Sequence, residues 1–289
     1  MASAVPSGLV VVDKPAGVTS HDVVARVRRL AGTRKVGHAG TLDPMATGVL
    51  VIGVERATRL LGHLMLTEKA YDATVRLGSS TTTDDAEGEV VASAALDGVT
   101  EADVRGALRA FEGEIQQVPT AVSAIKVDGK RAYARVRDGE QVELKARAVT
   151  IHEIVVHEVA VPDVRISVRC SSGTYIRAIA RDLGASLGVG GHLAALRRTA
   201  VGPFDLAAAR TLDELGEHFE VLPIAAAARA SFPSVDLSEE EAGHVRVGRA
   251  LDLSLPSAGE HALFSPDGEF LALYAAAGKR ATPVAVFVG

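Results

Sequence analysis

The stretch His38-Ala-Gly-Thr-Leu-Asp-Pro-Met-Ala-Thr-Gly-Val-Leu50 determines the fold and the chemistry that we expect of this chain. It sets one carboxylate, Asp43, on a predicted turn, five positions after a histidine and just before an apolar run. Its small residues let the backbone approach a partner closely and adopt positive φ where a turn requires it. An isolated Asp-Pro pair more often marks only a turn. The whole stretch, after a basic segment, instead predicts a carboxylate held open to a substrate.

Segments on either side of this stretch predict strands that alternate with helices. Leu9–Val12 and Val49–Val54 are continuous apolar runs, as in buried strands, whereas Tyr71–Leu77 and Val164–Cys170 alternate apolar and polar side chains. Helices are expected from Thr19 or Ser20 to Gly32, over Glu101–Phe111 and over about Thr174–Leu187. The pattern predicts a mixed α/β framework.

Composition changes near residue 230. Ser231–Ser234 is expected to be a linker, and the apolar runs beyond it predict a small β-rich unit. These runs lie near Ala262–Phe264, Phe270–Tyr274 and Val284–Val288. We therefore expect the chain to divide at residues 230 and 231.

Charge is unevenly distributed along the chain, whose formal net charge is −5. Residues 211–289 hold 5 basic and 12 acidic side chains, whereas residues 1–210 hold 26 and 24. Local basic clusters, rather than the total charge, attract phosphates. Three clusters stand out: Arg26, Arg28, Arg29, Arg34 and Lys35; Lys126, Lys130, Arg131, Arg135 and Arg137; and Arg177, Arg181, Arg197 and Arg198. One such cluster would indicate only a solvated face, but three near one proposed site favour a nucleic-acid partner.

Other classes of protein are disfavoured by composition. No apolar run reaches the length that spans a bilayer, and Gly8–Val12 has the pattern of a buried strand rather than of a signal peptide. A single cysteine excludes an internal disulfide framework and a cysteine-rich zinc site. We expect a soluble cytoplasmic protein with no membrane segment and no metal.

Four further motifs follow in order: Lys69-Ala-Tyr-Asp-Ala73, Thr83-Asp-Asp-Ala-Glu-Gly88, Gly173-Thr-Tyr-Ile-Arg177, and a Gly-x-His sequence that ends in Leu196-Arg-Arg198. With the stretch 38–50, they resemble the TruB family of bacterial tRNA pseudouridine synthases over about residues 8–203. The resemblance implies an α+β pseudouridine-synthase core over residues 1–230, with a mixed, mainly antiparallel sheet flanked by helices. It also implies a small β-rich, PUA-like C-terminal domain over residues 231–289.

For the catalytic residues, the resemblance implies Asp43, Tyr71 and Arg177. Isomerisation of uridine to pseudouridine breaks the N1–C1′ bond, turns the base and joins C5 to C1′, with no metal or cofactor. A carboxylate suits this reaction, because positive charge develops at the sugar as the base leaves. Arg177 would keep Asp43 ionised and oriented, and Tyr71 would stack on the base. The residue types leave open whether Asp43 adds to C1′, adds to the base or removes a ribose proton.

Further residues are implied to bind the substrate. The target uridine must leave its stack to be reached, and His38 would fill the vacated space. Leu196 would exclude water from the pocket, and Asp85 matches an aspartate of a loop of the family. An RNA-gripping insertion at about 118–144 would act through Lys126, Lys130 and Arg131.

We therefore predict a cofactor-free tRNA pseudouridine(55) synthase that acts as a monomer on the T-arm stem-loop. An RNA-guided member of the superfamily would need a guide RNA and partner proteins, whereas the compact length and the insertion favour a stand-alone enzyme. A non-catalytic tRNA-binding or folding protein would use Asp43 only as a turn former. A small-molecule enzyme with a phosphate loop at Gly32–Gly40 ranks last, because the segment lacks the order G-x-x-x-x-G-K-[ST].

Overall fold

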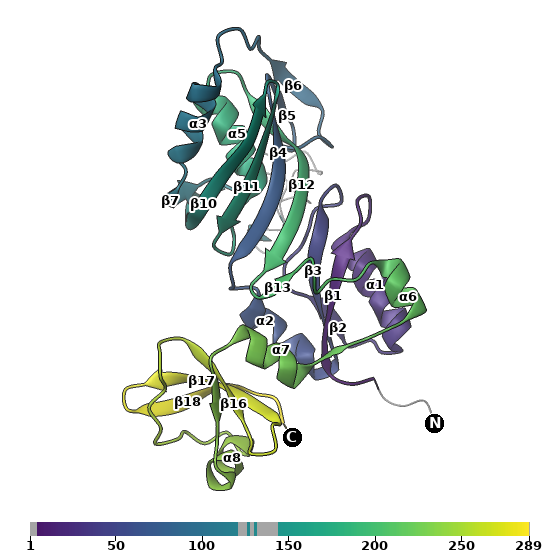
Figure 1. The fold of residues 1–289 in the computed structure, drawn as a ribbon, viewed down its shortest axis with the longest axis vertical. Coiled ribbons are helices and arrows are strands. Elements are labelled where there is room, and N and C mark those ends of the chain that lie inside the picture. The colour runs from purple at the N-terminus through teal and green to yellow at the C-terminus, as the bar shows by residue number, and fades with distance from the viewer. Residues whose placement is uncertain (1–4, 121–125, 128–129, 132–143, 289) are drawn as a thin grey trace.

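A ten-stranded sheet organises the first 223 residues of the chain (Figure 1). The computed structural model describes residues 5–120, 126–127, 130–131 and 144–288. The strands of this sheet are β1 (Gly8–Lys14), β2 (Val36–His38), β3 (Thr47–Val54), β4 (Lys69–Leu77), β7 (Gly113–Gln117), β10 (Arg147–Ala160), β11 (Asp163–Cys170), β12 (Gly191–Val201), β13 (Phe204–Asp205) and β14 (Leu222–Pro223). Their order is β14-β1-β3-β12-β4-β11-β10-β7, with β2 paired to β3 and β13 to β12.

Strand β12 joins the two halves of this sheet. It pairs antiparallel with β4, where Leu196 lies opposite Ala73, and parallel with β3, where Arg198 lies opposite Gly48. The other described pairs of this sheet are antiparallel. The predicted mixed, mainly antiparallel sheet is confirmed.

Helices flank both halves of the sheet (Figure 1). They are α1 (Ser20–Ala31), α2 (Leu61–Leu64), α3 (Glu101–Arg109), α5 (Ile176–Ser186), α6 (Leu212–Glu217) and α7 (Ile224–Ser231), with a 3-10 turn, η1, at Glu55–Arg59. The predicted start of α1 is confirmed, because Thr19 caps it in a capping box with Asp22 and Gly32 ends it at φ 64°. None of the helices in the described part of the chain is long and apolar enough to cross a membrane.

The alternation predicted for β4 is present and fixes the side on which its tyrosine lies. Tyr71, Ala73 and Val75 are buried in the core, whereas Asp72 between them is exposed. Helix α5 covers this buried face, and its Ile179 and Leu183 belong to the same core. Burial of one such aliphatic side chain contributes about 1.5–3 kcal/mol, so packing under α5 orders the strand that carries the tyrosine.

A second sheet forms the C-terminal part of the chain. Its order is β15-β16-β17-β18, with β15 at Ser234–Asp236, β16 at Glu260–Phe264, β17 at Phe270–Ala277 and β18 at Arg280–Val286, beside helix α8 (Glu239–Arg246). The β-rich character is confirmed, but two details of the prediction are wrong. The expected linker ends in β15, and the last strand begins at Arg280 instead of Val284, because residues 280–283 continue the hairpin with β17. A division at residues 230 and 231, and a PUA-like fold, stay predictions.

Two short strand pairs lie outside both sheets. Strands β5 (Ser79–Thr81) and β6 (Val90–Ser93) bracket the loop that contains Asp85. Strands β8 (Lys126–Val127) and β9 (Lys130–Arg131) pair within the predicted insertion 118–144. The rest of the insertion, apart from residues 118–120 and 144, lies outside the described residues, and its RNA-gripping role stays a prediction.

Gly48 provides a test of the junction between the two halves of the sheet. It has φ 98°, and a Cβ atom there would lie 2.2 Å from the Arg198 carbonyl oxygen. Gly17 has φ 80° but open space around its missing Cβ, so Gly17→Ala is the matched control for backbone strain alone. We expect Gly17→Ala to lower the free energy of unfolding in urea by about 1–2 kcal/mol. Gly48→Ala should cost about 1–3 kcal/mol more, because the strands must move apart. Equal losses in the two variants would contradict this close approach.

Candidate active site

Asp43 lies in the loop between β2 and β3, as the first residue of a β-turn. The Ala46 N–H donates to the Asp43 carbonyl oxygen at 3.1 Å, and Pro44 occupies the second position of the turn, which suits its fixed φ. The Ser20 hydroxyl, at the start of α1, donates to the Leu42 carbonyl oxygen at 3.0 Å and accepts from the Leu42 N–H at 2.9 Å. Asp43 thus lies on a short turn, and the residue immediately before it, Leu42, is hydrogen-bonded to α1.

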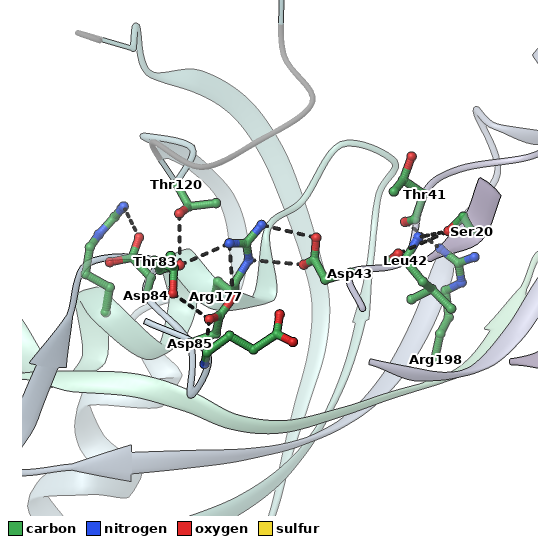
Figure 2. Close-up of polar contacts among 12 residues, drawn as sticks. Ser20, Thr41, Leu42, Asp43, Thr83, Asp84, Asp85, Thr120, Arg177 and Arg198 are labelled. Atoms are coloured by element: carbon green, nitrogen blue, oxygen red, sulfur yellow. Dashed lines mark hydrogen bonds and ion pairs between the residues drawn. The ribbon is translucent and has the colours of Figure 1, made fainter. Parts of the chain in front are cut away.

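Arg198 fastens the same loop from inside the protein (Figure 2). Its side chain, 1% exposed, donates to the carbonyl oxygens of Val49 at 2.7 Å, Gly40 at 3.2 Å and Thr41 at 3.4 Å. The sequence places Arg198 in a basic cluster that predicts phosphate binding, whereas its burial shows that it binds this loop instead. The sequence held a signal, however, because the period of two along β12 places Arg198 on the same face as Leu196.

The expected pair of Asp43 and Arg177 is present (Figure 2). Arg177 Nε lies 3.1 Å from Asp43 Oδ2, and Nη2 donates to Oδ1 at 3.3 Å. This two-pronged contact fixes the plane of the carboxylate as well as its position. The Arg177 side chain is 6% exposed, whereas that of Asp43 is 35% exposed, so the carboxylate remains the accessible partner.

A second carboxylate, that of Asp85, also pairs with Arg177. Arg177 Nη1 donates to Asp85 Oδ2 at 3.1 Å and to the Thr83 carbonyl oxygen at 3.0 Å. The Asp85 side chain is 4% exposed, and its Oδ1 accepts from the Thr83 hydroxyl at 2.5 Å and from the Glu87 N–H at 3.1 Å. This placement favours a positioning role for Asp85 over the predicted contact with substrate.

Burial and charge act in opposite directions on Asp43. Burial raises the pKa of its carboxyl, the Arg177 guanidinium lowers this pKa, and the Asp85 carboxylate raises it. The net effect is a raised pKa. Arg177 is therefore the main cation that favours the ionised form of Asp43 against its partial desolvation.

Four of the predicted residues line one small pocket: Asp43, Tyr71, Arg177 and Leu196. Its volume is about 70 Å³, and the remaining lining residues are Thr41, Leu42, Thr174, Tyr175 and Ile176. Burial raises the pKa of the Tyr71 phenol, so the ring enters the pocket in its neutral form. A larger cavity of about 700 Å³ also has Leu196 in its lining, but it lacks Asp43, Tyr71 and Arg177. The small pocket is therefore the candidate active site.

Two residues near Asp43 lie outside the lining of this pocket. His38 is at the end of β2, where its ring meets that of His21 edge-on at 5.6 Å between centroids. Lys14, which sequence analysis missed, is buried at the end of β1, and its Nζ donates to the carbonyl oxygens of Val18 at 2.7 Å, Pro15 at 2.9 Å and Pro44 at 3.2 Å. Burial lowers the pKa of Lys14 to about 8, although the charge of Asp43 opposes this shift.

Among the residues that the structure describes, no three His, Cys, Asp or Glu side chains are arranged so that they could bind a metal ion.

Family models match most of the chain. Residues 28–176 match the model of the TruB family pseudouridylate synthase N-terminal domain. Residues 177–223 match a tRNA pseudouridylate synthase B C-terminal domain, and residues 232–288 match tRNA Pseudouridine synthase II, C terminal.

Curated relatives cover nearly the whole chain. A protein of Arthrobacter sp. (strain FB24) named tRNA pseudouridine synthase B is 60% identical over 97% of this chain and 96% of its own length. One of the same name from Thermobifida fusca is 60% identical over 98% and 99%. Among solved structures, a Cbf5-Nop10-Gar1 complex contains a chain with TM-score 0.78 and 28% identity, over 99% of this chain and 86% of that one.

The fold, the aspartate–arginine pair at its centre and these matches together define the class, which is that of the pseudouridylate synthases. Within this class the chain belongs to the TruB family.

Arg177 and Asp85 have opposite effects on the pKa of Asp43, so their loss should shift the pH dependence of the rate in opposite directions. Loss of the cation in Arg177→Ala should raise the pKa of Asp43 and move the acidic limb of the single-turnover pH–rate profile to higher pH. Asp85→Asn removes a charge that raises this pKa, so the limb should move to lower pH. Arg105→Ala on α3, half-exposed and outside the pocket, is the control and should leave the limb unchanged. Shifts of the same sign in both site variants would contradict the arrangement.

Proposed function

We propose that this chain converts one uridine of tRNA, at position 55 in the T-arm loop, to pseudouridine without a cofactor. The observation that carries the proposal is the two-pronged contact between Asp43 and Arg177 inside a pocket walled by Tyr71 and Leu196. The curated relatives, each named a tRNA pseudouridine synthase B, support tRNA as the substrate.

In this proposal, Asp43 is the group that acts on the nucleotide. Breaking the N1–C1′ bond creates positive charge on the sugar, and an ionised carboxylate stabilises or captures such charge. Addition to C1′, addition to the base and removal of a ribose proton all require the ionised form, which Arg177 favours. The partly exposed face of Asp43 is where the nucleotide would approach.

Tyr71 and Leu196 enclose the base in this scheme. The neutral ring of Tyr71 offers a stacking surface, and Leu196 limits the access of water to a detached base. Extrusion of a base from its stack costs a few kcal/mol. His38, beside the Asp43 loop, would offset part of this cost by stacking in the vacated space.

Exposed basic side chains at the end of α1 and just before β2 are suited to bind phosphates. Arg28 and Arg29 are exposed in the last turn of α1, and Arg34 and Lys35 are exposed just before β2, which leads to the Asp43 loop. We assign Lys126, Lys130 and Arg131 to the same task on the insertion. We also propose that the chain acts on tRNA as a monomer, in the cytoplasm.

Release of tritium tests this function directly. Unmodified tRNA labelled at C5 of its uridines should lose the label of one nucleotide per molecule, because C5 exchanges its hydrogen for the bond to C1′. The release should persist in EDTA, and a tRNA with cytidine at position 55 should release none. Tight tRNA binding without release would favour the non-catalytic tRNA-folding alternative. Release from the cytidine-55 tRNA would place the target elsewhere.

A further inference from the structure

Helix α5 carries Arg177 in its first turn but has no side-chain cap. Tyr175 is its N-cap residue, and the Tyr175 side chain makes no capping hydrogen bond. The first N–H groups of a helix need partners, and an uncapped end frays readily. Something else must fix the start of a helix whose second residue meets Asp43.

Gln117, the last residue of β7, supplies that contact. Its side-chain Nε2 donates to the Tyr175 carbonyl oxygen at 3.1 Å, and its Oε1 accepts from the Tyr175 N–H at 2.8 Å. Gln117 is 1% exposed. The side-chain amide thus pairs with both backbone groups of one residue, as a neighbouring strand would. A flipped amide would set donor against donor and acceptor against acceptor, so the two contacts also fix its orientation.

Gln117 does not line the pocket but contacts a residue that does. Tyr175 and Arg177 line the pocket, whereas Gln117 does not. Arg177 is two residues beyond the clamped peptide, within the same turn of chain. A rotation of that turn would therefore move the guanidinium relative to Asp43.

The residues after Gln117 contact the same neighbourhood. The Thr120 hydroxyl donates at 3.3 Å to the Thr83 carbonyl oxygen, which is the acceptor of Arg177 Nη1 (Figure 2). The Val118 carbonyl oxygen accepts from Arg181 Nη2 at 2.8 Å. Residues 117–120 thus touch the surroundings of Arg177 in three places, of which the buried amide of Gln117 is the one that grips the backbone of α5.

We propose that Gln117 is a positioning residue for the reaction, whose side-chain amide sets the first turn of α5 and so the direction in which Arg177 meets Asp43. The inference rests on the proposed function, in which Asp43 acts on uridine. An apolar side chain in its place would leave the backbone groups of Tyr175 without these partners in the interior. A misplacement of about 1 Å can cost about 100-fold in rate.

The first test compares Gln117→Ala with Gln116→Ala, since Gln116 is the exposed neighbour on the same strand. The single-turnover rate constant for tritium release should fall about 10- to 100-fold in Gln117→Ala. Its tRNA Kd should stay within about threefold, because Gln117 is buried and is not among the residues proposed to bind RNA. Gln116→Ala should match the unaltered enzyme in both quantities. A wild-type rate in Gln117→Ala would overturn the proposal.

Gln117→Glu gives a readout that a general loss of stability would not move. The introduced carboxyl can donate to the Tyr175 carbonyl oxygen only when it is protonated, and burial raises the pKa of such a group. The rate of Gln117→Glu divided by that of the unaltered enzyme should therefore rise as pH falls, whereas the same ratio for Gln117→Ala should not rise, because a displaced Arg177 can only weaken the ionisation of Asp43. A flat ratio for Gln117→Glu would contradict the clamp. If the unaltered enzyme released no tritium, the proposed function would fail instead, so the two failures are distinct.

Discussion

The guanidinium of Arg177, almost completely buried between the carboxylates of Asp43 and Asp85, is the interaction on which the rest of the site depends. A buried charge is costly unless it is paired and hydrogen-bonded, so removal of either carboxylate leaves this cation poorly compensated. Asp85 is almost completely buried and pairs with Arg177 in the protein interior. Asp43 is partly exposed and faces the pocket, so one arginine connects the folded core to the group that meets the substrate.

The sheet explains how residues so distant in sequence meet. Strand β12 pairs with β3 on one side and with β4 on the other, which brings the Asp43 loop beside the strand of Tyr71. Helix α5 packs over the same junction and delivers Arg177. Arg198 then fixes the carbonyl groups of the loop, while the clamp of Gln117 acts on the start of the helix. Both partners of the ion pair are thus held by their backbones.

Sequence patterns predicted the parts of the site that local chemistry determines. Arg177 is identified through the resemblance of its motif to the TruB family, whereas the turn at Asp43 and the inward face of Tyr71 follow from neighbouring residues. The positioning contacts do not, because each joins segments distant in the chain: Asp85 and Arg177 are separated by 92 positions, and Gln117 and Tyr175 by 58. From the sequence alone, a polar residue at a strand end or in a loop is expected to face solvent. Only its tertiary contact shows that it positions another side chain. The register of the last strand was missed for a similar reason, since hairpin pairing extends β18 beyond its apolar run.

The central claim is that the charge of Asp43, rather than the shape of its loop, performs the chemistry. The most direct measurement is the single-turnover rate of Asp43→Asn on tritium-labelled tRNA, together with its tRNA Kd. Asp72→Asn is the matched control, because Asp72 is exposed beside Tyr71 on the opposite face of β4. The account predicts a loss of several orders of magnitude in rate for Asp43→Asn with tRNA affinity retained, and near wild-type behaviour for Asp72→Asn. A near wild-type rate for Asp43→Asn would contradict it.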